Sequence, residues 1–502
     1  MTTPAPTTPA RSRRTARVAR SVGAWRWPVL AFLAVVLVGA GLIDAAVGTG
    51  SPPPPATLAS AGAPRGSESS SWYCTGGTGG SGDAGATLQL VNSGPGAVSG
   101  TVTVVNDQGA SGSAPVTVPA GGQTAVATDQ VEQGNWLAAS IDLDGGGVVA
   151  SEIVEGATGW AQAPCASTTA SHWYFASGAT NNGSLLYVSL FNPTSTVSVV
   201  NLAFVTPKGL LRPQPFEGLV VNPGQLVVAG VASYVQGAPE VSTIVQAGSG
   251  RVVASELEVH NVGGRSGLSL RLGSPVTENE WSVPRTVHVT GTATTLEIFN
   301  PTSAPEKVTV TVHLPSGPVS PFEEQLAADA TWSLATSSST RIPGGTDFST
   351  TVSATGGSGV VVDRVVTGPT SGVVPQWGAV SAVGESATAI ESRQWILPSL
   401  DTPATPAEAG ATPFALALQN VGTGDVTVSV GRITPTGTER LGQIPELRIP
   451  VGAFTVIEPT TLGKEGSDPL VVRASGPLSA MEDAVPAAMP GVVALAGIPQ
   501  RT

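Results

Sequence analysis

The chain has 502 residues, of which 62 are Gly and 42 are Pro, and only 12% are charged. Its 3 Met and its small charged fraction exclude both a helix-rich protein and a charged, disordered one. A formal net charge of -12 repels phosphate, so the composition excludes a nucleic-acid-binding protein.

An apolar run at residues 28–47 follows a basic segment at residues 1–27 that contains no acid. Twenty helical residues span about 30 Å, the thickness of the hydrocarbon layer. The basic flank predicts a cytoplasmic N-terminus and an extracytoplasmic bulk, hence a single-pass protein of the cell membrane. A secreted protein, released after signal cleavage, is the alternative. Residues 48–70 contain four consecutive prolines, Pro52–Pro55, and are predicted to form a semi-rigid linker.

The chain contains only two cysteines, Cys74 and Cys165. An even number of cysteines outside the cell predicts one disulfide. It would close a loop of about 92 residues and stabilise the fold by about 4–5 kcal/mol through the entropy of the unfolded chain. Two free thiols are the alternative.

Three landmarks recur at intervals of 100 to 120 residues, which indicates tandem copies of one unit. Each copy opens on a tryptophan at the head of a short apolar segment: Trp72, Trp173, Trp281 and Trp395. An alternating strand then ends on an asparagine that is followed by turn residues: Asn92, Asn192, Asn300 and Asn420. A hairpin near the end of each copy carries an acid: Glu152, Glu256, Asp363 and Glu482.

Short alternating segments between turns predict an all-β protein with four tandem immunoglobulin-like antiparallel β-sandwich repeats after one N-terminal transmembrane helix. Each tryptophan is expected to fill a repeat core, and each asparagine to bond its own backbone at the strand end. The predicted parts are a cytoplasmic tail at 1–27, the anchor at 28–47, the linker at 48–70, and sandwiches at 71–166, 167–275, 276–388 and 389–502.

The second copy resembles a tandem repeat of secreted and surface proteins of actinobacteria. The resemblance rests on Trp173-Tyr-Phe-Ala-Ser-Gly178, Phe191-Asn192-Pro193, Val221-Asn-Pro-Gly-Gln225 and Val252-Val-Ala-Ser-Glu256. The layout as a whole is similar to an uncharacterised actinobacterial envelope family with one N-terminal anchor and an ectodomain of unknown function. The Glu-Arg pair of the repeat family is retained here only as Asp363-Arg364. The resemblance implies architecture and location, and it implies no chemistry.

The recurring acids are expected to face solvent, where charge discourages pairing between sheet edges. Contact with the next copy or with a partner is the alternative. Paired catalytic carboxylates would have to face each other across a cleft, and one acid per repeat does not predict that arrangement.

Other chemical signals are weak. The four histidines occupy unrelated repeat positions, and Asp142-Leu-Asp144 begins like a calcium loop but has Ile153 where the ligand Glu would stand. We therefore expect no catalytic residue, no metal and no cofactor. An exposed member of the four tryptophans outside the pattern would be the better candidate for stacking on a sugar: Trp136, Trp160, Trp332 or Trp377.

These patterns favour a non-enzymatic envelope protein whose sandwiches contact wall polymers or envelope proteins, and which binds no nucleic acid. One alternative is a carbohydrate-binding or accessory protein in the assembly of envelope polysaccharide. A second alternative is a hydrolase with a site between repeats.

Overall fold

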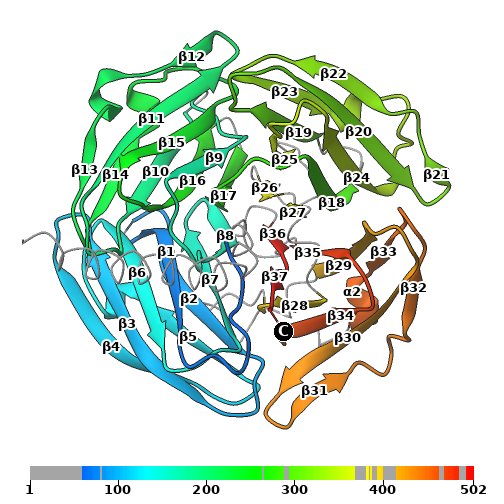
Figure 1. Ribbon diagram of the computed structural model, residues 1–502, viewed down its shortest axis with the longest axis horizontal. Helices are drawn as coiled ribbons and strands as arrows, with labels where there is room; N and C mark the ends of the chain where they lie inside the picture. The colour runs from blue at the N-terminus through cyan, green and yellow to red at the C-terminus, as the bar shows by residue number, and fades with distance from the viewer. Residues whose placement is uncertain are drawn as a thin grey trace, which may run out of the picture. The chain divides into compact units, whose positions relative to one another are not determined.

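The computed structural model describes residues 59–79, 82–181, 183–262, 265–287, 293–367, 380–383, 385–386, 393–399, 414–462, 468–484 and 493–501 (Figure 1). The predicted tail at 1–27, the predicted anchor at 28–47 and the prolines of the linker lie outside these residues. Among the described residues, no helix has both the length and the apolar character needed to cross a membrane. Residues Thr57–Thr502 form one compact unit.

The described part is nearly all β, as predicted, and its sheets are almost entirely antiparallel. Strands group into four sets along the chain, which we call modules 1 to 4. In each module, one sheet contains the strand with the recurring tryptophan (the Trp sheet). The other contains the strand that ends on the recurring asparagine (the Asn sheet).

Module 1 has the Trp-sheet order β4-β3-β6-β1 and the Asn-sheet order β5-β2-β7-β8. A parallel pairing between Thr78 and Gly85 joins the two sheets into one eight-stranded sheet. Its elements are β1 (Ser70–Thr78), β2 (Gly85–Asn92), β3 (Val98–Asn106), β4 (Ser111–Val118), β5 (Gln123–Ala127), η1 (Thr128–Gln130), β6 (Trp136–Leu143), β7 (Val148–Gly156) and β8 (Gly159–Pro164).

The Trp sheet of module 2 has the strand order β12-β11-β15-β9, and β13 also pairs with β11. The Asn sheet has the order β14-β10-β16-β17. The elements of module 2 are β9 (His172–Phe175), β10 (Leu185–Phe191), β11 (Ser198–Thr206), β12 (Gly209–Leu211), η2 (Gln214–Phe216), β13 (Leu219–Val221), β14 (Leu226–Gly230), η3 (Val231–Ser233), β15 (Ser242–Ser249), β16 (Val253–Val262) and β17 (Arg265–Leu272).

Module 3 repeats this order as β21-β20-β24-β18-β27, with β22 on β20, and β23-β19-β25-β26. Its elements are β18 (Glu280–Val287), β19 (Ala293–Asn300), β20 (Glu306–Leu314), β21 (Gly317–Pro318), β22 (Phe322–Leu326), β23 (Ala330–Ala335), η4 (Thr336–Ser338), β24 (Asp347–Ala354), β25 (Val361–Thr367), β26 (Val380–Val383) and β27 (Glu385–Ser386).

Module 4 has the orders β31-β30-β34-β28-β37, with β32 on β30, and β33-β29-β35-β36. Its elements are β28 (Gln394–Leu397), β29 (Phe414–Asn420), β30 (Val426–Thr434), β31 (Gly437–Arg440), β32 (Leu447–Ile449), β33 (Phe454–Ile457), α2 (Pro459–Leu462), β34 (Leu470–Ala474), β35 (Leu478–Ala484), β36 (Val493–Ala496) and β37 (Ile498–Pro499).

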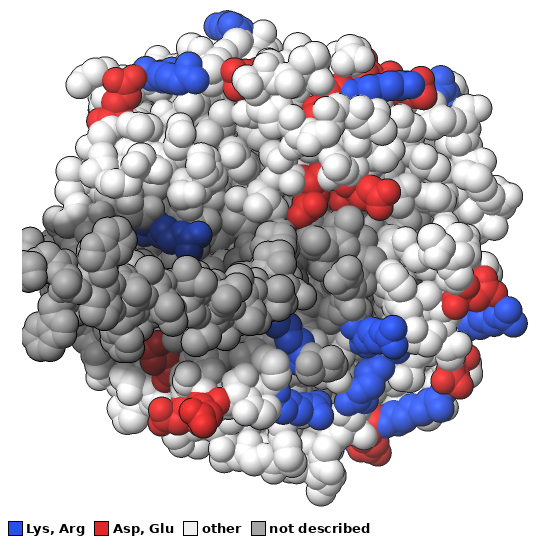
Figure 2. All heavy atoms as spheres, in the orientation of Figure 1, with Lys and Arg blue, Asp and Glu red and all other residues white. Residues whose placement is uncertain are grey.

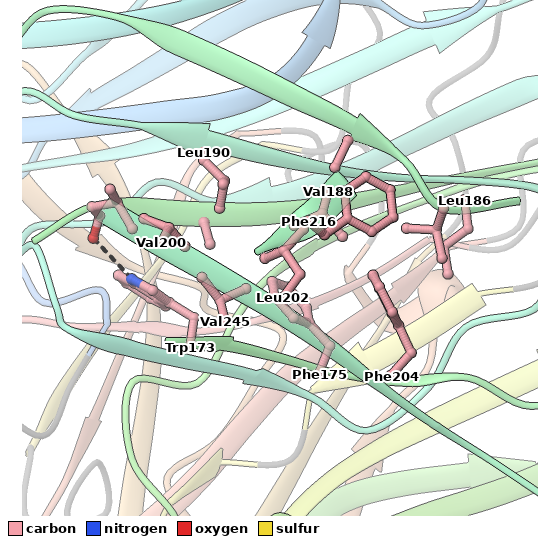
Figure 3. Packing of buried hydrophobic residues seen from close by; sticks show 14 of the residues in the cluster. Trp173, Phe175, Leu186, Val188, Leu190, Val200, Leu202, Phe204, Phe216 and Val245 are labelled. Carbon is pink, nitrogen blue, oxygen red and sulfur yellow. Dashed lines mark hydrogen bonds between the residues drawn. The ribbon is translucent and has the colours of Figure 1, made fainter. Parts of the chain in front are cut away.

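The core of each module lies between its two sheets, which makes the module sandwich-like. In module 2, Trp173 and Phe204 of the Trp sheet pack with Leu186 and Val188 of the Asn sheet, and all are buried (Figure 3). The indole N–H of Trp173 donates to the Val252 carbonyl at 2.8 Å, the dashed contact in Figure 3. Alternating β-branched residues produce this arrangement because successive side chains of a strand point to opposite faces.

The recurring asparagine ties the two sheets together in every module. All four asparagine side chains are fully buried. The Asn192 amide donates to the Thr196 carbonyl at 2.7 Å in its own turn, and to the Val221 carbonyl of β13 at 2.9 Å. Its side-chain oxygen accepts the Thr194 N–H at 3.0 Å. Asn92, Asn300 and Asn420 make the same set of bonds.

The last strands of the Asn sheets contact one another in a closed cycle. Strand β8 contacts β17, β17 contacts β26, β26 contacts β36, and β36 contacts β8 (Figure 1). The apolar cluster between modules 1 and 2 illustrates the packing: Ala161 and Ala163 of β8 meet Leu268 and Leu270 of β17. Module 4 therefore meets module 1, and the sandwiches do not form an open row.

The segment just before β1 also joins the first and last modules. From the sequence, residues up to 70 are expected to belong to the linker. The Gly62 N–H donates to the Pro499 carbonyl at 2.8 Å, and the Arg501 N–H donates to the Gly62 carbonyl at 3.1 Å. Ala61 is buried, and its N–H donates to the Ser167 hydroxyl at 3.0 Å. Small residues let this segment lie close to the sheets, so part of the predicted linker belongs to the folded body.

The predicted disulfide is confirmed. Cys74 of β1 and Cys165, just after β8, are bonded across a sequence separation of 91 residues, with Cα atoms 4.7 Å apart. Both side chains are buried in the module 1 core. The bond fixes the Trp strand of module 1 to the end of its Asn sheet.

Removing this crosslink should destabilise the protein by about 4 kcal/mol, because the unfolded chain regains the entropy of a long loop. The measurement is the urea unfolding midpoint of Cys74→Ser/Cys165→Ser against the wild type. Wild-type protein treated with reductant is the control and should match the variant. Equal midpoints for variant and oxidised wild type would contradict the prediction.

Candidate functional site

The recurring acids are buried, so the expectation that they face solvent is wrong. The exposed fractions of Glu152, Glu256, Asp363 and Glu482 are 3%, 0%, 3% and 1%. The strand register explains the burial of the three glutamates. Leu88 pairs with Glu152, Val188 with Glu256, and Leu416 with Glu482, and each leucine or valine belongs to a module core. Directly paired residues lie on the same face of a sheet, so these carboxyl groups face the core.

Module 3 places Arg364, and not Asp363, at the corresponding position. Leu296 pairs with Arg364, whereas Asp363 pairs with Glu297. A shift of one residue moves a side chain to the opposite face, so Asp363 points away from the module 3 core. The four acids share a residue type but not a strand position. Alignment from the first valine of Val148-Val-Ala-Ser-Glu152 and Val360-Val-Val-Asp-Arg364 would have identified the arginine.

In module 1, the buried group binds an irregular part of the Trp strand. The register of β1 shifts between Cys74 and Gly77, and the Gly76 N–H donates to the Glu152 carboxylate at 2.9 Å. A Cβ on Gly76 would lie 2.1 Å from the Leu270 side chain of module 2, so a larger residue here would require that side chain to move. The irregular strand thus brings a buried carboxyl group and a neighbouring module to the same place.

Module 3 fills the corresponding place with the opposite charge. The register of β18 shifts between Val283 and Thr286, and the Arg364 guanidinium donates to the Arg285 carbonyl within this shift. A carboxylate accepts from strand N–H groups, whereas a guanidinium donates to strand carbonyls. The position therefore tolerates either charge, provided that the backbone presents the matching group.

Module 2 holds a buried ionic cluster at this position. Arg271 of β17 lies 2.9 Å from Glu256 and 3.4 Å from Glu258, and His260 lies 2.9 Å from Glu258. The Thr243 hydroxyl donates to Glu256 at 2.9 Å. Burial raises the pKa of Glu256 to about 8 despite the opposing charge of Arg271. Burial also opposes ionisation of Glu258, but the charges of His260 and Arg271 outweigh it and lower its pKa.

Asp363 crosses from module 3 to module 2. Its Oδ2 accepts the Ala176 N–H at 3.1 Å, and both the N–H and the hydroxyl of Ser177 at 2.9 Å. The Arg271 guanidinium donates to the same hydroxyl at 3.1 Å, which links this contact to the ionic cluster.

Every junction between modules carries a related polar contact. Thr75 of module 1 bonds Ser255 of module 2 at 2.6 Å. Arg364 of module 3 pairs with Asp483 of module 4. Gln89 of module 1 donates to Ser399 of module 4 at 3.2 Å. The polar groups that recur in the sequence are thus largely engaged inside and between the modules.

One surface cavity of about 210 Å³ lies between modules 3 and 4. Glu280, Trp281 and Ser282 of β18 line one side, and Asn420 and Val451 line the other. Trp281 is only 3% exposed, and its indole N–H donates to the Val360 carbonyl. The cavity therefore offers hydroxyl and carboxylate groups with an aromatic edge, and no open aromatic face.

The recurring tryptophans are buried in the modules, with exposed fractions of 0% for Trp72, Trp173 and Trp395. Outside the pattern, Trp160 is also fully buried. The Trp136 ring packs against the Tyr187 ring of module 2, with ring centroids 4.7 Å apart. Trp377 lies outside the described residues. Within the described ranges, no group of three or more His, Cys, Asp or Glu side chains could hold a metal ion.

Glu152 should make stability depend on pH. Burial raises its pKa to about 7 from 4.5, against the N–H groups of β1. The stability that protonated Glu152 contributes is fully present below pH 4.5 and is lost as the pH rises to about 7. The reason is that this carboxyl group ionises at a lower pH in the unfolded chain than in the folded protein. A shift from 4.5 to about 7 corresponds to about 3 kcal/mol. The wild type should lose about 3 kcal/mol more of its unfolding free energy between pH 4.5 and 7 than Glu152→Gln does, as measured by urea unfolding.

The control for this experiment is Glu68→Gln on an exposed side chain, which should leave the pH profile unchanged. If Glu152→Gln shows the wild-type loss over the same pH range, then the carboxyl group is not protonated in the folded protein.

Asp363→Ala should destabilise the junction between modules 2 and 3 by about 3 kcal/mol, because three buried donors lose their acceptor. Urea unfolding measures the loss, and limited proteolysis should show faster cleavage between β17 and β18. Ser255→Ala, at the junction of modules 1 and 2, is the matched control and should cost about 1 kcal/mol. Equal effects of the two substitutions would contradict a special role for Asp363.

No curated protein matches this sequence. Among solved structures, Thermotoga maritima 1070 is 16% identical with a TM-score of 0.19, covering 22% of this chain and 95% of its own. The Anabaena sensory rhodopsin transducer is 19% identical with a TM-score of 0.15, covering 18% of this chain and 96% of its own. A tetra-tandem repeat from the extending region of a large adhesion protein is 13% identical with a TM-score of 0.10, covering 82% of this chain and 95% of its own.

A sequence family of unknown function, DUF5719, matches residues 128–431. The match begins in module 1 and ends in β30 of module 4, so it includes the complete second and third modules. Because the match covers more than half of the 502 residues, the chain belongs to this family of unknown function, DUF5719.

Proposed function

We propose that this chain is a non-enzymatic extracytoplasmic protein of an actinobacterial cell envelope. Residues 28–47 anchor it in the plasma membrane with the N-terminus in the cytoplasm. Four immunoglobulin-like repeats then present a surface to wall polymers or envelope proteins. A secreted form, released after signal cleavage, is the alternative location.

The observation that carries this proposal is the disulfide between Cys74 and Cys165. Disulfides form and persist in oxidising compartments outside the cytoplasm. The chain has no cysteine beyond this pair, and the pair follows a basic segment and an apolar run of membrane length. Export accounts for all three features together.

A role in presenting a surface is supported by the use of the recurring polar groups. Glu152 binds the irregular Trp strand of module 1, Glu256 pairs with Arg271 inside module 2, and Asp363 of module 3 binds module 2. Burial withdraws these carboxyl groups from solvent and from a substrate.

The cavity between modules 3 and 4 favours the second candidate, a carbohydrate-binding or accessory role in polysaccharide assembly. Its size is close to that of one sugar ring, and the exposed Glu280 offers a carboxylate that can bond sugar hydroxyls. Because Trp281 is buried, such binding would rest on hydrogen bonds more than on stacking. A hydrolase with a site between repeats is the third candidate.

The test is protease accessibility of the full chain with one epitope at each end, expressed in a bacterial host. Protease added to spheroplasts should remove the C-terminal epitope and spare the N-terminal one. Both epitopes should sediment with membranes before digestion. Release of the C-terminal epitope into the medium would indicate the secreted form. A cytosolic marker protein is the control for intact cells, and protection of both epitopes would refute the proposal.

A further inference from the structure

Five arginines gather at the surface where module 4 meets the chain ends: Arg65, Arg393, Arg440, Arg473 and Arg501. We call this set the arginine patch. Figure 2 shows Lys and Arg side chains concentrated over β28, β34, β30 and β31, beside the C-terminus. Such a concentration is notable in a chain with a formal net charge of -12.

A chain of side-chain bonds holds the patch together. The Arg473 guanidinium donates to Gln394 at 3.1 Å, and Gln394 bonds Gln500. The Ser93 hydroxyl donates to the same Gln500 oxygen at 2.8 Å and also accepts from Arg65 at 3.4 Å. Arg473 and Arg65 therefore stand at the two ends of one polar chain.

The remaining members lie next to this chain of bonds. Arg393 and Arg501 are the sequence neighbours of Gln394 and Gln500. Arg440 is two residues from Thr438, whose hydroxyl accepts from Arg473 at 2.9 Å. The patch is thus built from five places in the sequence that only the fold brings together.

No acid of the described part of the chain neutralises the positive charge of the patch. Among the described residues, no carboxylate lies within the 4.0 Å ion-pair distance of any of the five arginines. By contrast, Arg432 and Arg448 of the same sheet each pair with an acid at 2.7 Å. Burial lowers the pKa of Arg473, and the nearby charge of Arg65 lowers it further. Four of the five side chains are exposed.

The layout of the patch favours an extended ligand. The sheet order is β31-β30-β34-β28-β37, and neighbouring strands lie about 4.8 Å apart. The arginines between β31 and the residues after β37 therefore span about 20 Å. A single small anion would contact one or two of them, whereas a linear polymer could contact all five.

We propose that the arginine patch binds an anionic wall polymer with phosphodiester groups. Each guanidinium can donate two parallel bonds to phosphate oxygens. The net negative charge of the chain does not prevent this, because salt screens charges more than about 10 Å away. This inference rests on the proposed location outside the cytoplasm, since the polymer is found there.

The test uses the full chain in a non-ionic detergent, with long-chain inorganic polyphosphate as the probe. Hydrogen exchange should show protection in β28, β34, residues 498–501 and residues 61–66 when polyphosphate is added. The logarithm of the binding constant should fall with the logarithm of the salt concentration with a slope of about -3.5, from about 0.7 for each of the five contacts. Neutral dextran should produce neither effect.

The variant Arg393→Gln/Arg501→Gln removes two exposed charges with no hydrogen bond from either side chain among the described residues. It should weaken binding at least tenfold and reduce the salt slope by about 1.4. Arg432→Gln/Arg448→Gln, on the same sheet, is the matched control and should change affinity less than twofold. Protection confined to the basic residues before 28, or equal binding by the two double variants, would overturn the proposal.

The last experiment adds anionic phospholipid vesicles as competitors of polyphosphate. If they compete as well as polyphosphate at equal phosphate concentration, then the patch recognises a membrane surface and the polymer assignment is wrong. The outcome is separable from the test of location. An exported chain that does not bind polyphosphate refutes only the patch, and a chain that stays in the cytoplasm refutes the proposed function.

Discussion

The fold depends on satisfying backbone polar groups where two sheets meet at a turn. A β-sandwich with tight turns leaves carbonyl groups at its edge that are shielded from water, and each unpaired group costs about 1–3 kcal/mol. One buried asparagine amide in each module serves both sheets, as with Asn192, which bonds its own turn and the Val221 carbonyl. The same solution at four positions fixes where each Asn sheet ends, and hence which residues of the next hairpin face the core.

The buried acids are a consequence of that register. Once Leu88 faces the core of module 1, the paired Glu152 must face it as well, and the irregular β1 strand supplies an N–H group to receive it. In module 3 the same position carries Arg364, whose guanidinium donates to the Arg285 carbonyl. The four modules therefore share positions and differ in charge, which gives each junction its own pattern of polar contacts.

Closure of the modules on one another determines which surfaces remain available. The last strands of the Asn sheets are covered in their mutual contacts, and the segment around Gly62 covers part of module 1 and the C-terminal strand. The surfaces that remain available are therefore the Trp sheets, the turns and the junction surfaces. The arginine patch lies on such a surface, at the only place in the described fold where the segment before β1 and the end of the chain meet.

The sequence alone determined the all-β class, the cysteine pairing and the recurrence of the landmarks. These follow from local periodicity, turn chemistry and the presence of two cysteines, none of which requires knowledge of distant contacts. The tertiary structure decided the direction of the acids, because a single-residue shift between Asp363 and Arg364 reverses the face of the sheet. It also decided whether the modules form a rod or a closed set. Contacts such as Gln89 with Ser399, 310 residues apart, leave no trace in the local sequence pattern, and neither does an arginine patch assembled from five separate parts of the chain.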